Sequence, residues 1–450
     1  MNGPEVSLGT AAWYGDDDLT ITFPRGWDVA VHRPRTPTPL TDRDIAAALD
    51  APVDQPPLRV VARGSHRPVV IVDDLTRPTP ADIVLPHVLR QFEEAGIERR
   101  RVTIVVASGS HGPPDATQLA KKVGNDILGD CRVVAHDHTR NLVRTGRTSI
   151  GTPILVNADV ARSDLVVGIG GVYPQHSTGF GGGSKLVMGV LGEKSIVALH
   201  YRHRGMEGSY QVDNSFRRDL DEIAMQIEMR TAVSIHVDER RRLVRIVSGD
   251  HLRYFADAAA FSLGAYAAPP PTGADVVIAN AYPMDVSLTF AHSKGIGPLL
   301  LGRSAATRVM LAACSEGVGH HAVFPIADRP WVQAPRALVR TARWRPGEVP
   351  RKVGRRLRTA VRSLSSPAGD REPHEGTADR PIGGRPIWLV GPARALPEGI
   401  RGIHPLVSWE EGVCHMVEEQ GKDRPLSAAV YSCAPLQTIA SVGGIDVSDD

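Results

Sequence analysis

Short apolar segments recur along the first half of the chain, and a polar cluster follows most of them. The alternating run Leu19–Phe23 predicts a strand that turns into a hairpin at Trp27. A helix is expected over 81–95, among four apolar runs that predict buried strands. These runs are Pro68–Val72, Arg101–Ala107, Cys131–Ala135 and Asp164–Gly170. Strands that alternate with helices predict a mostly parallel sheet, so the polar clusters should meet at its carboxyl edge.

A second α/β unit follows a proline break. Pro269–Pro271 comes after a helical segment, and Asp275–Ala279 begins a new apolar strand. The further elements expected are a helix at 287–301, strands at 308–313, 386–390 and 427–431, and a helix from the N-cap Ser408 to Glu419. The pattern therefore predicts two Rossmann-like α/β domains with mostly parallel sheets, over 1–266 and 272–450, and an active-site cleft between them.

Composition excludes some classes of function but does not indicate one. The formal net charge of the 450 residues is +2, which argues against a whole-protein role in binding nucleic acid. Nine arginines and one lysine occupy 336–362, where apolar residues at helical spacing favour a solvated helix face. The segment 336–384 as a whole is expected to be mobile. The sequence lacks a signal-peptide pattern and a membrane-spanning run, and its four cysteines form no C-x-x-C pair, so we expect a cytoplasmic protein.

A glycine-rich loop at Pro174–Lys185 follows the strand predicted to end at Gly170. Its four glycines lack a Cβ, so their backbone N–H groups can approach a ligand closely. They are Gly179, Gly181, Gly182 and Gly183. Lys185 closes the loop in a chain with seven lysines and 45 arginines, which favours a nucleophilic role for its amine. Ser184 and Leu186 depart from the P-loop pattern. A glycine turn that packs tightly and binds nothing remains an alternative.

Histidines gather near the predicted strand ends and the glycine loop. Imidazole transfers protons near neutral pH and is also a common ligand of nickel, zinc and copper. The candidates are His111, His136, His138, His176, His200 and His203. Arg77 shares a loop with Asp74 and Thr76, where its guanidinium could clamp a carboxylate or a phosphate. The alternative is an Arg–Asp pair that only staples the turn.

Taken in order, these motifs resemble the lactate racemase family, whose enzymes use a nickel-pincer nucleotide cofactor. The residues that carry the resemblance are Asp74–Pro78, Gly109–His111, His136–Asp137, Gly179–Lys185, His200, Asp285 and Lys294. The resemblance implies that Lys185 is tethered to the cofactor through a thioamide. It implies that His200 supplies the remaining ligand of nickel, with His203 as the competing candidate.

The same resemblance implies roles for the other site residues. Asp74, Thr76, Arg77 and the glycine backbone would hold the cofactor phosphate and the substrate. His111 matches one of two catalytic histidines, and Lys294 matches a lysine that meets the substrate or the cofactor across the cleft. The implied partners are a 2-hydroxy acid and the enzymes that make the cofactor. Because the α-proton of such an acid is very weakly acidic, oxidation with hydride transfer to the cofactor is the easier route to racemisation.

The chain departs from the family pattern at the second catalytic histidine. Gln175 stands at that position and His176 follows it, and an amide cannot shuttle a proton at neutral pH. Phe290 and Ala291 stand where the family often has Tyr and Gln, which predicts a less polar substrate pocket. We therefore expect an isomerase that racemises or epimerises a 2-hydroxy acid. The alternatives are a redox isomerase or one-sided epimerase with the same cofactor, a non-catalytic cofactor carrier, and a zinc or iron hydrolase.

Overall fold

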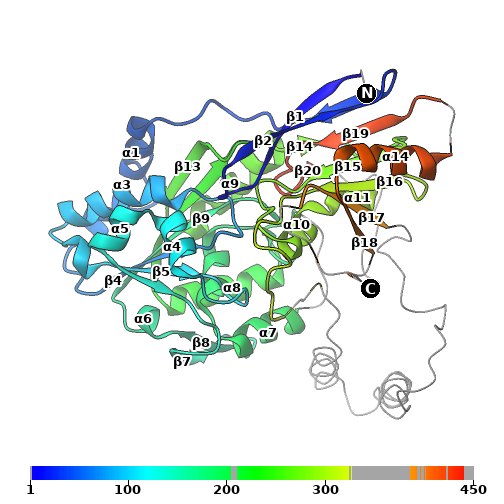
Figure 1. The fold of residues 1–450 in the computed structure, drawn as a ribbon. Coiled ribbons are helices and arrows are strands. Elements are labelled where there is room, and N and C mark those ends of the chain that lie inside the picture. The colour runs from blue at the N-terminus through cyan, green and yellow to red at the C-terminus, as the bar shows by residue number, and fades with distance from the viewer. Residues whose placement is uncertain are drawn as a thin grey trace, which may run out of the picture.

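The computed structural model describes residues 3–203, 210–323, 326, 386–392, 396, 400, 402–421 and 424–439. A six-stranded sheet forms the centre of its first half, shown on the left of Figure 1. In spatial order its strands are β13 (Leu243–Gly249), β12 (Met229–Val237), β9 (Leu165–Gly171), β4 (Pro68–Asp73), β5 (Thr103–Ala107) and β6 (Arg132–Ala135). All neighbours pair in parallel except β12 and β13. The predicted parallel sheet is confirmed, and the β12–β13 hairpin at its edge is an element that the sequence pattern did not reveal.

Helices cover both faces of this sheet because its strands are apolar on both sides. Val70 and Val72 of β4 enter one hydrophobic core, whereas Val69 and Ile71 enter another, as the alternation of side chains along a strand requires. The helices of this half are α1 (Asp42–Asp50), α2 (Leu58–Val61), α3 (Ala81–Glu94), η1 (Arg99–Arg101), α4 (Ala116–Val123), α5 (Asn125–Asp130), α6 (Ala158–Ala161), η2 (Gly183–Val190), α7 (Glu193–Arg202), α8 (Ser215–Gln226) and α9 (His251–Ala265). Residues of α1 and α3 enter the first core, and residues of η2, α8 and α9 enter the second.

A second six-stranded sheet, parallel throughout, forms the other half. Its strands in spatial order are β18 (Ile403–Leu406), β17 (Ile387–Val390), β16 (Thr307–Leu311), β15 (Val276–Asn280), β19 (Ser427–Tyr431) and β3 (Asp28–His32). Its helices are α10 (Leu288–Gly295), α11 (Gly297–Leu301) and α14 (Trp409–Gln420). The predicted N-cap is confirmed, because Ser408 Oγ accepts a hydrogen bond from the Glu411 amide. The single helix expected over 287–301 is instead two helices, since Pro298 disfavours helical continuation.

The N-terminal segment belongs to the second sheet although it precedes the first in the sequence. The hairpin β1 (Glu5–Thr10) and β2 (Asp17–Thr22) lies beside β19 and α14 in Figure 1. The rings of Phe23 and Trp409 meet edge to face at 5.3 Å. Strand β3 pairs with β19, so 1–266 is not one continuous structural unit. The division into 1–266 and 272–450 otherwise remains a prediction, and 336–384 lies outside the described residues.

The remaining strands are short pairs. They are β7 (Leu142–Arg147) with β8 (Pro153–Asn157), β10 (Pro174–Gln175) with β11 (Gly179–Phe180), and β14 (Ala267–Ala268) with β20 (Thr438–Ile439). In the described part of the chain no helix is long and apolar enough to cross a membrane. The pair β10–β11 extends from the carboxyl end of β9, which places the glycine loop at the sheet edge that the sequence pattern predicts.

Candidate active site

The ends of β4 and β5 bring together an acid and a base. His111 Nδ1 lies 2.7 Å from Asp74 Oδ2, and the imidazole is only 15% exposed. Burial raises the pKa of Asp74, but the opposing effects of His111, Arg77 and Thr76 are larger and lower that pKa to about 2. Burial lowers the pKa of His111, and the Asp74 carboxylate offsets this only in part. An ionised Asp74 therefore accepts the Nδ1–H of a neutral His111, which leaves Nε2 as a proton acceptor.

Arg77 brings a buried positive charge to the same edge. Its guanidinium lies 5.5 Å from the centre of the Tyr173 ring and 5.6 Å from that of Phe290. Its Nη1 donates to the carbonyl of Thr76 at 3.3 Å, and no ion pair joins it to another described residue. The alternative to the predicted clamp was an Arg–Asp pair that only holds the turn together. The contacts do not show that pair, because Asp74 bonds to His111 and Thr76 instead of Arg77. A buried guanidinium of this kind is suited to a carboxylate or a phosphate.

The glycine loop is a β-hairpin that packs closely on the protein. A Cβ on Gly179 would lie 2.1 Å from the carbonyl oxygen of Gln211, and one on Gly183 would lie 2.8 Å from the Phe255 ring. Both glycines also have a positive φ, of 73° and 53°. Gly181 and Gly182 are similarly crowded by Tyr173 and Val172. Tight packing is thus sufficient to require these glycines, and their contact with a cofactor remains a proposal.

Arg217, from α8, fixes the shape of this hairpin. Its guanidinium donates to the carbonyls of Thr178 and Phe180 and covers the Phe255 ring at 3.7 Å. The α8 N-cap Asn214 accepts from the Arg217 amide at 2.8 Å. The backbone carbonyls of the hairpin are therefore occupied by an arginine from a distant helix.

Lys185 lies just after the hairpin, in η2, and its side chain is buried. Burial and the charges of Arg77 and Arg217 lower the pKa of Lys185 to about 7. Its amine makes no hydrogen bond or ion pair with the rest of the described chain. A buried amine that is partly neutral near pH 7 is chemically a nucleophile. The geometry is consistent with the covalent role predicted from the sequence.

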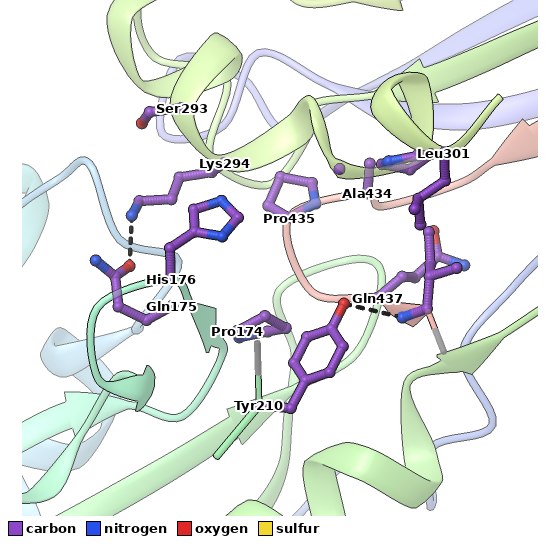
Figure 2. A pocket seen from close by; sticks show the side chains of 13 residues that line it. Pro174, Gln175, His176, Tyr210, Ser293, Lys294, Leu301, Ala434, Pro435 and Gln437 are labelled. Atoms are coloured by element: carbon purple, nitrogen blue, oxygen red, sulfur yellow. Dashed lines mark hydrogen bonds between the residues drawn. The ribbon is translucent and has the colours of Figure 1, made fainter. Parts of the chain in front are cut away.

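Gln175 and Lys294 meet from the two halves of the molecule. Lys294 Nζ donates a hydrogen bond to Gln175 Oε1, and Figure 2 shows this contact at one side of a pocket. The pocket is lined by Pro174, Gln175, His176, Tyr210, Ser293, Lys294, Gly297, Pro298, Leu301, Ala434, Pro435, Gln437 and Ile439. Burial, with the charges of Arg77 and Lys185, lowers the pKa of Lys294 well below its usual range. His176 is exposed at the hairpin turn, one residue beyond the β10–β11 pairing.

The two candidate metal ligands on and after α7 have different surroundings. His200 Nδ1 donates to the carbonyl of Ile196 at 2.8 Å, which fixes a tautomer whose Nε2 can bind a metal. His203 uses both nitrogens in protein contacts, with Ser215 Oγ at 2.9 Å and Asp219 Oδ2 at 3.0 Å. The charges of Lys185 and Lys294 add to burial in lowering the pKa of His200 to about 4. Both ring nitrogens of His203 are thus occupied by protein contacts, and in the described chain no cluster of three His, Cys, Asp or Glu forms a metal site by itself.

Other residues singled out in the sequence have structural contacts. Asp285 is buried and accepts backbone N–H groups of Ala11, Ala12 and Ala313, so it ties the N-terminal segment to the second half. The ring of His136 is buried and bonds through Nε2 to the carbonyl of Leu191 at 3.0 Å. These contacts account for the burial of both side chains without a ligand.

One residue near the site, His321, was not among the sequence candidates. Its ring lies 5.1 Å from that of His111, although the two residues come from different halves of the chain. The pair Gly319–His320 before it stands after a predicted strand of the second half, which is the same kind of signal that marked His111. That signal was present in the sequence but lay outside the motifs of the resemblance.

The fold is similar to the folds of solved structures. The structure of the lactate racemase apoprotein from Thermoanaerobacterium thermosaccharolyticum matches with a TM-score of 0.68 at 18% identity, over 97% of this chain and all of that one. A protein from Thermotoga maritima matches with a TM-score of 0.58 at 17% identity, over 90% of this chain and all of that one. These likenesses confirm the mixed α/β fold with mostly parallel sheets.

Sequence comparisons also find similarity to lactate racemases. The lactate racemase N-terminal domain family matches residues 14–210. The lactate racemase of Lactiplantibacillus plantarum is 27% identical over 290 residues, which cover 61% of this chain and 66% of that protein. The lactate racemase of T. thermosaccharolyticum is 25% identical over 298 residues, which cover 62% of this chain and 68% of that protein. These matches support the predicted family, the lactate racemases, and the predicted enzyme class, an isomerase. The aligned part spans about two thirds of these curated relatives.

Proposed function

We propose that this protein racemises or epimerises a 2-hydroxy acid by reversible hydride transfer from Cα to a nickel-pincer nucleotide. The observation that carries the proposal is the neutral His111, held by Asp74 beside the buried cation Arg77. Lys294 brings an amine to the same site from the other half, and burial with the Arg77 charge lowers its pKa. A 2-hydroxy acid needs a base to take its hydroxyl proton and positive charge to bind the adjoining carboxylate, and this site has both.

The residues present fit the proposed cofactor. The buried amine of Lys185 has no partner in the described chain and would form the tether. His200 would give nickel its protein ligand, because its Nδ1 is occupied by the Ile196 carbonyl. When bound, the cofactor would supply the hydride acceptor that no protein side chain can provide. The cofactor-making enzymes as partners and a cytoplasmic location belong to the same proposal.

The protein's own residues would handle the substrate and its proton. Arg77 would bind the carboxylate, with Lys294 as a second cation from the other half. His111 Nε2 would take the hydroxyl proton while Asp74 keeps the imidazole in the required tautomer. Phe290, whose ring lies 4.5 Å from that of His111, gives the substrate site an apolar wall. A hydroxy acid with an apolar side chain therefore suits the site better than a polyhydroxylated one.

The cofactor assignment is tested by mass and metal content. Protein co-expressed with the cofactor-making enzymes should be heavier than apoprotein by one cofactor, and Lys185→Ala should remove that increment. His200→Ala should lower the nickel content, whereas the matched control His203→Ala should retain nickel and unfold at a lower temperature, because both nitrogens of His203 are bonded within the protein. An increment that survives Lys185→Ala would contradict the tether.

The reaction is tested with enantiopure acids. The holoenzyme is incubated in D₂O with D- and L-lactate, 2-hydroxybutyrate and mandelate, and the products are separated by chiral chromatography. Racemisation with no deuterium at Cα is expected, because a hydride never exchanges with solvent. Deuterium at Cα would refute hydride transfer. Conversion in one direction only, or to an isomeric keto compound, would favour the redox-isomerase alternative, and cofactor binding without turnover would favour a carrier.

A further inference from the structure

A second imidazole approaches His111 from the other half of the molecule. The ring centres of His111 and His321 are 5.1 Å apart with planes tilted by 58°, and the Phe290 ring contacts both, at 4.5 and 6.1 Å. Residues 317–323 hold His321 there through backbone contacts on two sides. The Ala322 amide donates to the Ser110 carbonyl at 2.9 Å, next to His111. His321 is thus built into the site by both halves.

The hydrogen bonds of the two rings give them opposite capacities. His321 Nδ1 accepts the Val323 amide at 3.3 Å and lies 3.3 Å from Ser110 Oγ. Because a backbone N–H can only donate, the neutral His321 carries its proton on Nε2. His111 has the reverse arrangement, since its Nδ1–H points to Asp74 and its Nε2 accepts. The two rings therefore carry their protons on different nitrogens, Nδ1 in His111 and Nε2 in His321.

A substrate hydroxyl can use both rings at once, since it donates one hydrogen bond and accepts others. We propose that His321 is a catalytic hydrogen-bond donor whose Nε2–H contacts the oxygen on Cα. This inference rests on the proposed function. With the proposed cofactor as acceptor of the hydride from Cα, the hydroxyl proton would move to His111 Nε2, and the carbonyl oxygen that forms would stay hydrogen-bonded to His321. The return step reverses both transfers, and His321 neither gains nor loses a proton.

The position of Gln175 makes this donor useful. Gln175 Oε1 accepts a hydrogen bond from Lys294, so Gln175 is bound to the other half of the molecule. Its amide does not titrate, so it cannot act as a second base. Burial and the neighbouring His111 lower the pKa of His321 well below its usual range, which keeps it neutral. A neutral donor stabilises a developing oxyanion without taking the proton that His111 must receive.

The test compares three variants of the holoenzyme on D- and L-lactate, 2-hydroxybutyrate and mandelate. His321→Ala should lower kcat by about 10²–10³-fold, the usual cost of removing one such donor, with a smaller change in KM. His321→Gln keeps an N–H donor that does not titrate and should recover at least about tenfold of that loss. His320→Ala, an exposed neighbour on the same loop, is the matched control and should stay within about threefold of wild type.

Each outcome decides the matter. If His321→Ala turns over at the wild-type rate, the donor role is overturned while the proposed function stands. Equal losses in the Ala and Gln variants would also overturn it, since a donor is retained in one of them. If His321→Ala does not fold, as judged by its melting temperature, recovery in the folded Gln variant decides. A wild-type holoenzyme that converts no tested acid would overturn the proposed function and this inference together.

Discussion

The two sides of the site are built differently. On one side, the loops after β4 and β5 place Asp74 and His111 at the end of a buried parallel sheet, with a carboxylate fixing the imidazole. On the other, a short hairpin and α10 bring Gln175 against Lys294, beside a pocket. The first side has a base with a fixed tautomer, and the second has an amide held by a lysine.

The two sides also differ in how firmly the fold holds them. Strand ends in a parallel sheet are rigid, because each strand is hydrogen-bonded on both sides and covered by helices. The hairpin β10–β11 has only two paired positions, Pro174 with Phe180 and Gln175 with Gly179. We infer that the β4–β5 side carries the reaction, whereas the hairpin side adjusts which acid is accepted.

The largest effect should come from the base. His111→Gln should lower turnover by about 10²–10⁴-fold, as is typical when a general base is lost. Since burial lowers the pKa of His111, kcat/KM should stay level around neutral pH and decline only under more acidic conditions. Asp74→Asn removes the group that raises this pKa, so the decline should move to still lower pH while the maximum rate falls. Rate profiles against pH measure both changes, and an unchanged profile in Asp74→Asn would contradict the pairing.

An intermediate effect is expected on the other side. Lys294→Met removes the partner of Gln175 and one cation, so KM for the acid should rise by about tenfold, the equivalent of roughly one charge-assisted hydrogen bond. The maximum rate should change much less. Ser293→Ala, which alters the neighbouring pocket residue, is the control for general disturbance of α10. A large fall in kcat at constant KM would place Lys294 in the chemical step and break the distinction between the two sides.

The smallest effect is expected at the hairpin turn. His176→Ala should remain within about threefold of the wild-type rate, because His176 is exposed and Gln175 is the one that bonds to Lys294. Steady-state turnover of both enantiomers measures this. A fall of 10²-fold or more would show that His176 has replaced the missing base, and the hairpin side would then share the proton chemistry.

Local pattern was sufficient for several strands of both large sheets. Continuous apolar runs give β4, β5, β9 and β15 almost at their observed bounds, because strands buried on both faces need apolar side chains throughout. The order of the motifs, through the family resemblance, predicted that His111 and Lys185 share one site. The β12–β13 hairpin escaped prediction, as did the pairing of β3 with β19, since no local pattern states which distant strand is a partner.

By itself, then, the sequence determined several strands and helices, the family that the chain resembles and the residue types of the site, because periodicity and motif order are properties of neighbouring residues. The tertiary structure alone decided how those residues are paired. In the folded protein Asp74 pairs with His111, both nitrogens of His203 contact protein groups, and Lys294 bonds to Gln175. It also carried His321 from the second half to within 5.1 Å of His111. The tautomer and charge of a buried group depend on the atoms around it, and those atoms are assembled only when the two sheets pack together.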